Sequence, residues 1–506
     1  MRREGRSSTG PLREPTRRAA PPAKRLALLL GISFVIPFFI LFTLIALDVR
    51  LGEGYFAYRY SPIRGVRTPR AFLAIVFGLL ACGAVWMLVR NRRAAGLGLF
   101  ALTLALWGWW IWWGPPYPWT QHMFSFTSPS SDGAFVVESQ LKVTSLPMYL
   151  RTFPERLKTS IDEMHGTRVL SNPPGMTILA DIVGKRMPGR EALERRLVER
   201  GDADADGVER IAAALRVAMF LCAIWAAAGG FAYALGRLFL SPAAAVVFAV
   251  AVTFNPCAVD FAPGKDPAQL VTVTAMMWAW FAAMNKRNHV LAALAGAILV
   301  IGATFSLVHI WVALAAFAAT LWHDRHGTLK NTIAAAIGTV VVVAAVYVAI
   351  AWNIPATVLA VSRRWGEIQH TFAMNRTVWY FIGLPIFLLF LSPAVFALGG
   401  LSIRRRRLNL GTKLAICTIV VMLFIYVVLG VTYELPRLWV AFLPPLLLGL
   451  CIDRPLLRGN PQTRRPRLAM PLMLIILTQV SFTALHWTLF DVREVEYRLI
   501  SQRYYH

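Results

Sequence analysis

The ionisable residues that could take part in chemistry lie in short polar segments between long apolar blocks. Four of these segments combine carboxylates with cationic side chains: Asp132, Glu138, His165 and Arg168; Asp260, Lys265 and Asp266; Arg363, Arg364, Glu367, His370 and Arg376; and Glu434 and Arg437. A carboxylate can accept the proton of a hydroxyl group as the hydroxyl oxygen attacks a sugar carbon. Arginine, lysine or histidine can hold the departing phosphate. Brought to one membrane face, these groups suit a transferase that uses a lipid-phosphate donor.

Simpler structural roles remain open for the same residues. Asp132 and Ser131 precede an amphipathic run, and either can be the N-cap of a helix. Glu434 and Arg437 are three residues apart at a helix start and can form an ion pair within that helix. An arginine at a membrane boundary is often an interfacial anchor, and His165 can be an ordinary loop residue. The prediction of chemistry therefore rests on the whole set rather than on any one residue.

The apolar blocks that separate these segments are long enough to cross a membrane. Of the 506 residues, 57% are hydrophobic and 15% are charged, and the mean hydropathy is +0.56. A helix of about 20 apolar residues spans the hydrocarbon core and satisfies its own backbone hydrogen bonds there. The sequence therefore predicts an all-α polytopic membrane protein with about 13 transmembrane helices. The predicted spans are residues 26–48, 71–90, 95–113, 209–234, 241–256, 268–284, 288–304, 306–322, 331–352, 377–399, 411–432, 438–452 and 468–488.

The net charge of +26 fits a membrane protein better than a nucleic-acid-binding one. A basic chain often binds nucleic acid, but here Arg and Lys stand mainly at the ends of apolar blocks, where the positive-inside rule places them on the cytoplasmic side. If the N-terminus is cytoplasmic, alternation puts the dense basic runs inside and the long connection 114–208 outside. We therefore expect an integral protein of the plasma or inner membrane, with membrane lipids but no nucleic acid among its partners.

The long connection contains a proline-rich turn, Asn172-Pro173-Pro174-Gly175, which starts an apolar stretch. Proline is well placed in the first turn of a helix, so the turn predicts a helix start. If this stretch crossed the bilayer, the later basic loops would change sides. We therefore expect residues 164–183 to form a helix that lies at the outer interface or dips into it.

The sequence identifies no cofactor. The five cysteines include no Cys-x-x-Cys pair and no Cys/His group, so neither a disulfide framework nor a zinc site is predicted. The external carboxylates leave a divalent cation open, although no ligand spacing supports one.

Several short motifs, in their order along the chain, resemble those of the GT-C membrane glycosyltransferases, the superfamily of the protein O-mannosyltransferases and the aminoarabinose lipid A transferases. Asp132, in SSDGAFVVESQ, matches the Asp early in the first large external loop of that family. The Asn172–Gly175 turn is similar to the family's His-Pro-Pro-Gly turn, with Asn in place of His. The later matches are Arg210 or Arg216 at the start of the next span, Pro256 and Asp266 in the next external turn, and Glu434, Arg437 and Trp439 as a Glu-x-x-Arg-aromatic motif.

This resemblance implies an inverting transfer of a sugar from a polyprenyl-phosphate-linked donor to a lipid, glycan or protein acceptor on the non-cytoplasmic face. It gives Asp132 the role of general base. The residues expected to bind the donor phosphate or the acceptor are Lys265, Asp266, His165, Arg363, Arg364, His370, Arg376, Glu434 and Arg437. Asn172, Pro173, Pro174 and Gly175 form the motif turn.

The expected domain organisation follows from the same motifs. Residues 1–25 are a disordered, basic cytoplasmic tail, and residues 26–94 are a two-helix addition at the N-terminus. Residues 95–488 form the GT-C-like transmembrane module, in which 114–208 is the external loop with interfacial helices. Residues 489–506 are an external C-terminal tail.

Other functions are open to a polytopic protein. A transporter or flippase would show ionisable residues buried within spans, broken helices and an internal repeat. A polysaccharide polymerase or ligase places its large loop late in the chain, and a non-catalytic membrane protein of cell-envelope assembly needs no site at all. The transferase prediction requires that Asp132, Asp266 and Glu434 converge in space.

Overall fold

The computed structural model describes residues 23–47, 61–62, 94–113, 132–159, 167–200, 207–371, 376–402, 408–432, 435–452 and 469–491, and the single residues 76, 80, 84 and 87. Within these residues the chain is helical, except that the two-residue strands β1 (Ser61–Pro62) and β2 (Phe490–Asp491) pair antiparallel. The prediction of an all-α fold is confirmed for the described part of the chain.

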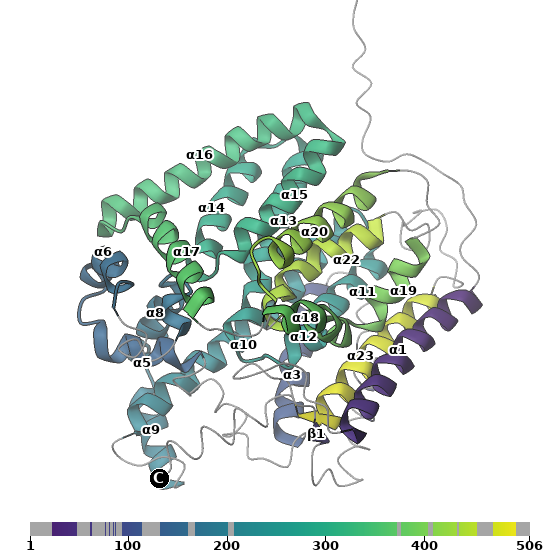
Figure 1. Ribbon diagram of the computed structural model, residues 1–506, viewed down its shortest axis with the longest axis horizontal. Coiled ribbons are helices and arrows are strands. Elements are labelled where there is room, and N and C mark those ends of the chain that lie inside the picture. Colours follow the sequence, from purple (N-terminus) through teal and green to yellow (C-terminus); the bar gives the residue numbers. More distant parts are fainter. Residues whose placement is uncertain are drawn as a thin grey trace, which may run out of the picture.

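The helices pack into one bundle, shown in Figure 1. In chain order they are α1 (Ala23–Ala46), α3 (Ala95–Trp113), α5 (Gly133–Lys142), α6 (Leu146–Arg156), α7 (Thr167–Leu170), α8 (Gly175–Leu179), the π-helix η3 (Ala180–Arg186), α9 (Arg190–Glu199), α10 (Val208–Arg237), α11 (Pro242–Thr253), α12 (Pro256–Val259), α13 (Lys265–Lys286), α14 (His289–Phe305), α15 (Val308–His323), α16 (Arg325–Ile350), α17 (Ile354–Thr371), α18 (Arg376–Phe390), α19 (Pro393–Ser402), α20 (Leu410–Val427), α21 (Leu435–Leu438), the 3-10 helix η4 (Trp439–Phe442), α22 (Leu443–Ile452) and α23 (Ala469–Leu489).

Some of these helices are long and apolar enough to cross a membrane. Among the described residues there are five: Arg25–Ala46, Val208–Arg237, Arg325–Ile350, Leu410–Val427 and Leu435–Ile452. Shorter apolar helices are Ala95–Ala105, Pro242–Thr253, His289–Phe305, Val308–His323 and Leu472–His486. The architecture is compatible with a membrane-embedded helical protein. The number of thirteen crossings stays a prediction, and the predicted span 71–90 lies almost entirely outside the described residues.

The predicted span 377–399 is divided in the structure. Tyr380–Phe390 and Pro393–Gly399 together have the apolarity of a sixth span, but they are bent by 101° at the break between them. Pro393 opens the second helix. Since proline has no N–H and clashes with the preceding turn, a continuous helix would be disrupted at this point.

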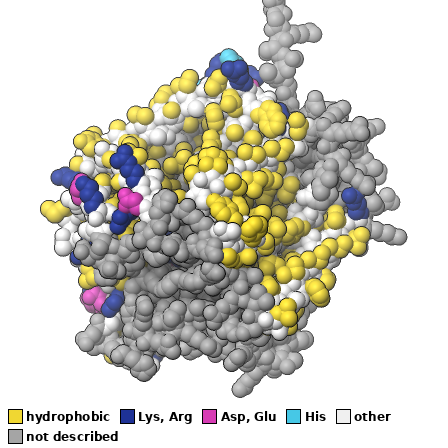
Figure 2. All heavy atoms as spheres, in the orientation of Figure 1, with side chains coloured by type: hydrophobic (Ala, Val, Ile, Leu, Met, Phe, Trp, Pro, Cys, Tyr) yellow, Lys and Arg dark blue, Asp and Glu magenta, His cyan; other side chains and the backbone are white. Residues whose placement is uncertain are grey.

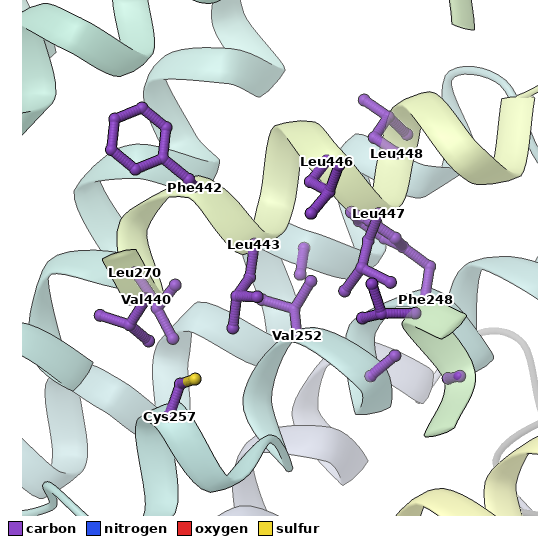
Figure 3. Close-up of a cluster of buried hydrophobic side chains, with 14 of the residues drawn as sticks. Phe248, Val252, Cys257, Leu270, Val440, Phe442, Leu443, Leu446, Leu447 and Leu448 are labelled. Atoms are coloured by element: carbon purple, nitrogen blue, oxygen red, sulfur yellow. The ribbon is translucent and has the colours of Figure 1, made fainter. Parts of the chain in front are cut away.

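The main core includes buried residues of α11, α13 and α22. Figure 3 shows Leu443 beside Val252 and Leu447 beside Phe248, and all four belong to one buried cluster. α11 consists almost wholly of Ala, Val and Phe, so it is apolar on every side and buried on nearly every side. A helix of this composition forms the centre of a bundle rather than its surface.

The N-terminal helix α1 belongs to this core. It lies alongside α23 in Figure 1 and also packs against α19. Leu30 and Leu41 of α1 are fully buried, and the Phe38 ring lies 5.1 Å from that of Phe482 in α23. The first helix of the predicted N-terminal addition is therefore integrated with α23, the last helix among the described residues.

The described surface is strongly apolar. Hydrophobic side chains cover most of the described surface in Figure 2, and Lys, Arg, Asp and Glu gather at a few places on its margin. α16 shows the pattern most clearly, because its exposed residues include Ile333, Ile337, Val340 and Val348. A soluble protein rarely exposes so continuous an apolar surface, and the surface is compatible with contact with lipid.

The described part of the long connection has a smaller core of its own. Phe135 of α5, Phe153 of α6 and Leu170 of α7 are buried together with Leu215 of α10 and Val361 of α17. The single interfacial helix expected over 164–183 is instead the sequence α7, turn, α8 and η3, because Pro173 and Pro174 end one short helix before the next begins. This folded loop carries Asp132 to the start of α13.

Candidate functional site

Asp132 is held by two donors from distant parts of the chain. Arg168 of α7 donates from Nη1 to Asp132 Oδ1 at 2.8 Å, and the backbone N–H of Lys265 donates to Oδ2 at 2.9 Å. Asp132 does occupy the N-cap position of α5, but its side chain makes no capping hydrogen bond there. Its carboxylate lies instead at the N-terminus of α13, whose first N–H it accepts. The helix dipole of α13 favours a negative charge at that position.

Gly264 makes this approach possible. A Cβ atom at Gly264 would lie 2.6 Å from the Phe261 carbonyl oxygen and 3.1 Å from Asp132 Oδ2. Both distances are shorter than an ordinary contact, so any larger residue would displace the carboxylate or the turn. The glycine in NPCAVDFAPGKDP is therefore explained by the position of Asp132, which is remote in sequence.

Asp266 joins the same group of residues to α21. Lys265 Nζ lies 2.7 Å from Asp266 Oδ1, Gln269 Nε2 donates to the same oxygen at 3.0 Å, and Arg437 Nε lies 2.7 Å from Oδ2. We call Asp132, Arg168, Lys265, Asp266, Gln269 and Arg437 the charged cluster. Arg437 thus pairs across the bundle, while Glu434, its expected partner within one helix, lies outside the described residues.

The charged cluster is buried and carries more positive than negative charge. Asp132 is 4% exposed and Lys265 only 2%. The cluster has three cations, Arg168, Lys265 and Arg437, against the two carboxylates Asp132 and Asp266, a surplus of one positive charge among its residues. Because removing an ion from water is costly, each charge here needs its partners. An anionic ligand would balance the remaining positive charge.

The proline-rich turn supports Arg168. Asn172 Nδ2 donates to the Arg168 carbonyl oxygen at 2.9 Å, so Asn172 caps the end of α7. Pro174 is the N-cap of α8, as the turn predicted. A Cβ atom at Gly175 would lie 2.7 Å from the carbonyl carbon of Thr304 in α14, and closer still to its oxygen. The turn therefore packs closely against α14, and this contact fixes the position of α7.

A second buried carboxylate, Glu138, braces α5 against α6. Arg156 donates from Nε and Nη2 to the two Glu138 oxygens, both at 3.1 Å, and the Tyr149 hydroxyl donates to Oε1 at 3.2 Å. Burial and the nearby negative charge of Glu138 raise the pKa of Tyr149 well above its usual value. This arrangement orients α5, the helix that follows Asp132, and has the geometry of a structural support.

The predicted residues of α17 have different surroundings. Arg364 Nη1 lies 2.7 Å from Glu367 Oε2, and Nη2 donates to the Thr159 carbonyl oxygen at 3.0 Å, which connects α17 to the turn after α6. Arg363 is exposed. The structure thus gives Arg364 a role in holding the loop core and does not bring Arg363 into the charged cluster. His165 and the side chains of His370 and Arg376 lie outside the described residues.

Two contacts at or near the site were not predicted from the sequence. Gln269 lies three residues after Asp266, so its position on the same helix face could have indicated a contact. His486 Nδ1 lies 2.8 Å from Asp260 Oδ2, and both residues are buried. A histidine near the end of an otherwise apolar block was the available signal. In the described part of the chain, no group of three or more His, Cys, Asp or Glu residues could hold a metal ion.

Comparison with known proteins adds no family assignment. No protein-family model matches the chain, and no curated protein matches its sequence. The relation to the GT-C enzymes stays a prediction that rests on the motifs and on the geometry above.

Proposed function

We propose that the protein is a membrane glycosyltransferase that moves a sugar from a polyprenyl-phosphate-linked donor to an acceptor hydroxyl group on the non-cytoplasmic face, with inversion. The observation that supports this most directly is the convergence of Asp132 with Lys265, Asp266 and Arg437. These residues come from three polar segments far apart in sequence, yet direct contacts join them. Scattered interfacial anchors would have no reason to meet in one buried cluster.

In the proposed reaction, Asp132 acts as the general base. The Asp132 carboxylate takes the proton of the acceptor hydroxyl group while the hydroxyl oxygen attacks the anomeric carbon. The bond between that carbon and the phosphate oxygen breaks, and its electron pair leaves with the polyprenyl phosphate. Arg168 and the Lys265 N–H each occupy one lone pair of the carboxylate. Each oxygen keeps another lone pair, which can accept the proton.

The cations of the charged cluster would stabilise the leaving phosphate. Lys265 and Arg437 share Asp266 as a partner, so they are held in place before a ligand arrives. Preorganised cations of this kind stabilise charge that develops in the transition state without having to reorganise. The surplus positive charge of the cluster agrees with an anionic donor. The acceptor is a lipid, a glycan or a protein.

The test is sugar transfer by the purified full-length chain in lipid nanodiscs, with a panel of polyprenyl-phosphate sugars. Asp132→Asn should lower the turnover rate by about 10²- to 10⁴-fold, the usual contribution of a general base. Glu155→Gln is the matched control, because Glu155 is an exposed acid of the same loop and pairs only with exposed Lys158 among its described contacts. Full activity of a folded Asp132→Asn protein would refute the assignment.

A transporter is the second candidate, and the bent pair α18–α19 is the observation that favours it. Broken helices at ligand sites are common in transporters. Proteoliposome uptake separates the two functions, because a transporter moves its substrate without covalent change. A non-catalytic membrane protein of cell-envelope assembly would show neither activity.

A further inference from the structure

Helix α23 carries three buried polar side chains on one face. Gln479, Thr483 and His486 are four and three residues apart, which is the spacing of one helix face, and each is at most 1% exposed. We call them the polar stripe. The rest of α23 is mainly apolar. Buried polar groups in such a helix are costly unless they have partners, so their contacts matter.

All three bind one segment, residues 254–264, which we call the connector because it joins α11 to α13. Gln479 Nε2 and Thr483 Oγ1 both donate to the Phe254 carbonyl oxygen, at 2.6 and 2.7 Å. His486 Nδ1 lies 2.8 Å from Asp260 Oδ2. The polar stripe therefore holds the connector at its beginning and again at its middle.

The connector is also held by the helix that ends at the bend. The Phe261 ring stacks on the Phe390 ring at 5.8 Å, and Cys257 Sγ lies 3.7 Å from the Phe390 carbonyl oxygen. Phe390 is the last residue of α18, and its ring lies 5.0 Å from that of His486. The connector is thus fixed between α23 and the end of α18.

The connector leads directly into the charged cluster. It ends at Gly264. The next residue, Lys265, donates its backbone N–H to Asp132 and forms an ion pair with Asp266 through its ammonium group. A shift of the connector would move both contacts together. We propose that Gln479, Thr483 and His486 are positioning residues that fix the connector and thereby the Asp132–Lys265 contact. The effect on catalysis rests on the proposed function, but the effect on the connector does not.

Hydrogen–deuterium exchange of the purified full-length chain in nanodiscs tests the proposal without a substrate. The variants are the pair Gln479→Leu/Thr483→Val, which removes both donors to Phe254, and Asp260→Asn, which keeps the side-chain shape. We expect the amides of residues 257–265 to exchange about tenfold faster, as when a buried hydrogen bond is lost. The amides of 289–350, in α14–α16, should be unchanged.

The matched control is Thr478→Val, because the Thr478 hydroxyl donates to the Leu474 carbonyl oxygen within α23 itself. It should leave exchange in the connector unchanged. Unchanged exchange at 257–265 in the test variants, or an increase spread evenly over the whole chain, would overturn the proposal. The second outcome would mean that the polar stripe only stabilises the fold.

Activity supplies an independent measurement. In the transfer assay, the test variants should lower kcat about tenfold, because Lys265 no longer holds Asp132 in its reactive position. If Asp132→Asn has no effect on transfer, the assignment of Asp132 as the base fails; if no transfer is found at all, the proposed function fails, and in both cases the exchange result still decides the role of the polar stripe. If transfer depends on Asp132 but kcat is unchanged in the test variants, the positioning role fails alone.

Discussion

Replacing Gly175 by alanine should destabilise the protein, although the same change usually stabilises a helix. Gly175 is the first residue of α8. An added Cβ atom would lie 2.7 Å from the Thr304 carbonyl carbon, against at least 3.4 Å for an ordinary contact. The obstacle is backbone, which cannot rotate away, so α8 or α14 has to move by most of an ångström. Overpacking of this kind costs about 1–3 kcal/mol.

The sign of the effect separates this explanation from helix propensity. Alanine is favoured over glycine by up to about 1 kcal/mol inside a helix. Gly31 in α1 is the control, because a Cβ atom there would meet nothing within 4 Å. We therefore expect Gly31→Ala to leave the stability unchanged or raise it slightly, and Gly175→Ala to lower it.

The measurement is thermal unfolding in detergent, followed with a thiol-reactive dye. The side chains of Cys222, Cys257 and Cys451 are buried, so their thiols react only when the bundle opens. The midpoint should fall by about 1 °C for each kcal/mol lost, because the entropy of unfolding grows with chain length. An unchanged or raised midpoint for Gly175→Ala would show that α8 and α14 are not in the close contact described here.

Three further predictions concern the support of the site. Glu138→Ala should lower stability by about 1–3 kcal/mol, because it leaves Arg156 and Tyr149 without their shared acceptor. Thermal midpoints of Glu138→Ala, Arg156→Met and the double variant should show a coupling between residues 138 and 156. Since the pKa of Tyr149 is raised, the folded chain keeps the phenol proton above a pH of about 10, where the unfolded chain loses it. The stability that this group contributes is complete below that pH and is lost as the pH rises further. Tyr149→Phe should therefore reduce the alkaline loss of stability, measured as thermal midpoints from pH 8 to 11. Arg364→Ala should lower the thermal midpoint by the equivalent of about 1 kcal/mol. Arg363→Ala, at an exposed position, should change the stability by no more than about 0.5 kcal/mol. Equal effects of the two variants would contradict the different surroundings of the two arginines.

Helix positions followed well from the sequence where apolar blocks had clear ends. The predicted span 288–304 corresponds to α14 (His289–Phe305), and Asn288 caps that helix by accepting two backbone N–H groups. The block 377–399 shows the limit of this reasoning. Its composition is that of one span, but the direction of the chain after Pro393 depends on what packs around the break.

For the site, the sequence could name residues but not their partners. The sequence is compatible with Asp132 both as a base and as a helix cap, and the structure shows that its side chain accepts from a different helix, α13. Arg437 binds Asp266 of α13, a contact that the spacing of Glu434 and Arg437 does not predict. Sequence spacing predicts contacts within one helix, whereas contacts between helices depend on how the helices pack.

The sequence by itself determined that the chain is helical and apolar, because hydrophobicity and helix-ending residues act locally. It also determined which segments carry ionisable groups. Only the tertiary structure decided which of these groups meet: it brought Asp132 to Lys265 and Asp266 to Arg437, left Arg364 in the loop core, and gave His486 the partner Asp260. The physical reason is that a buried charge must find an opposite charge, and in a helical bundle that partner comes from whichever helix packs alongside.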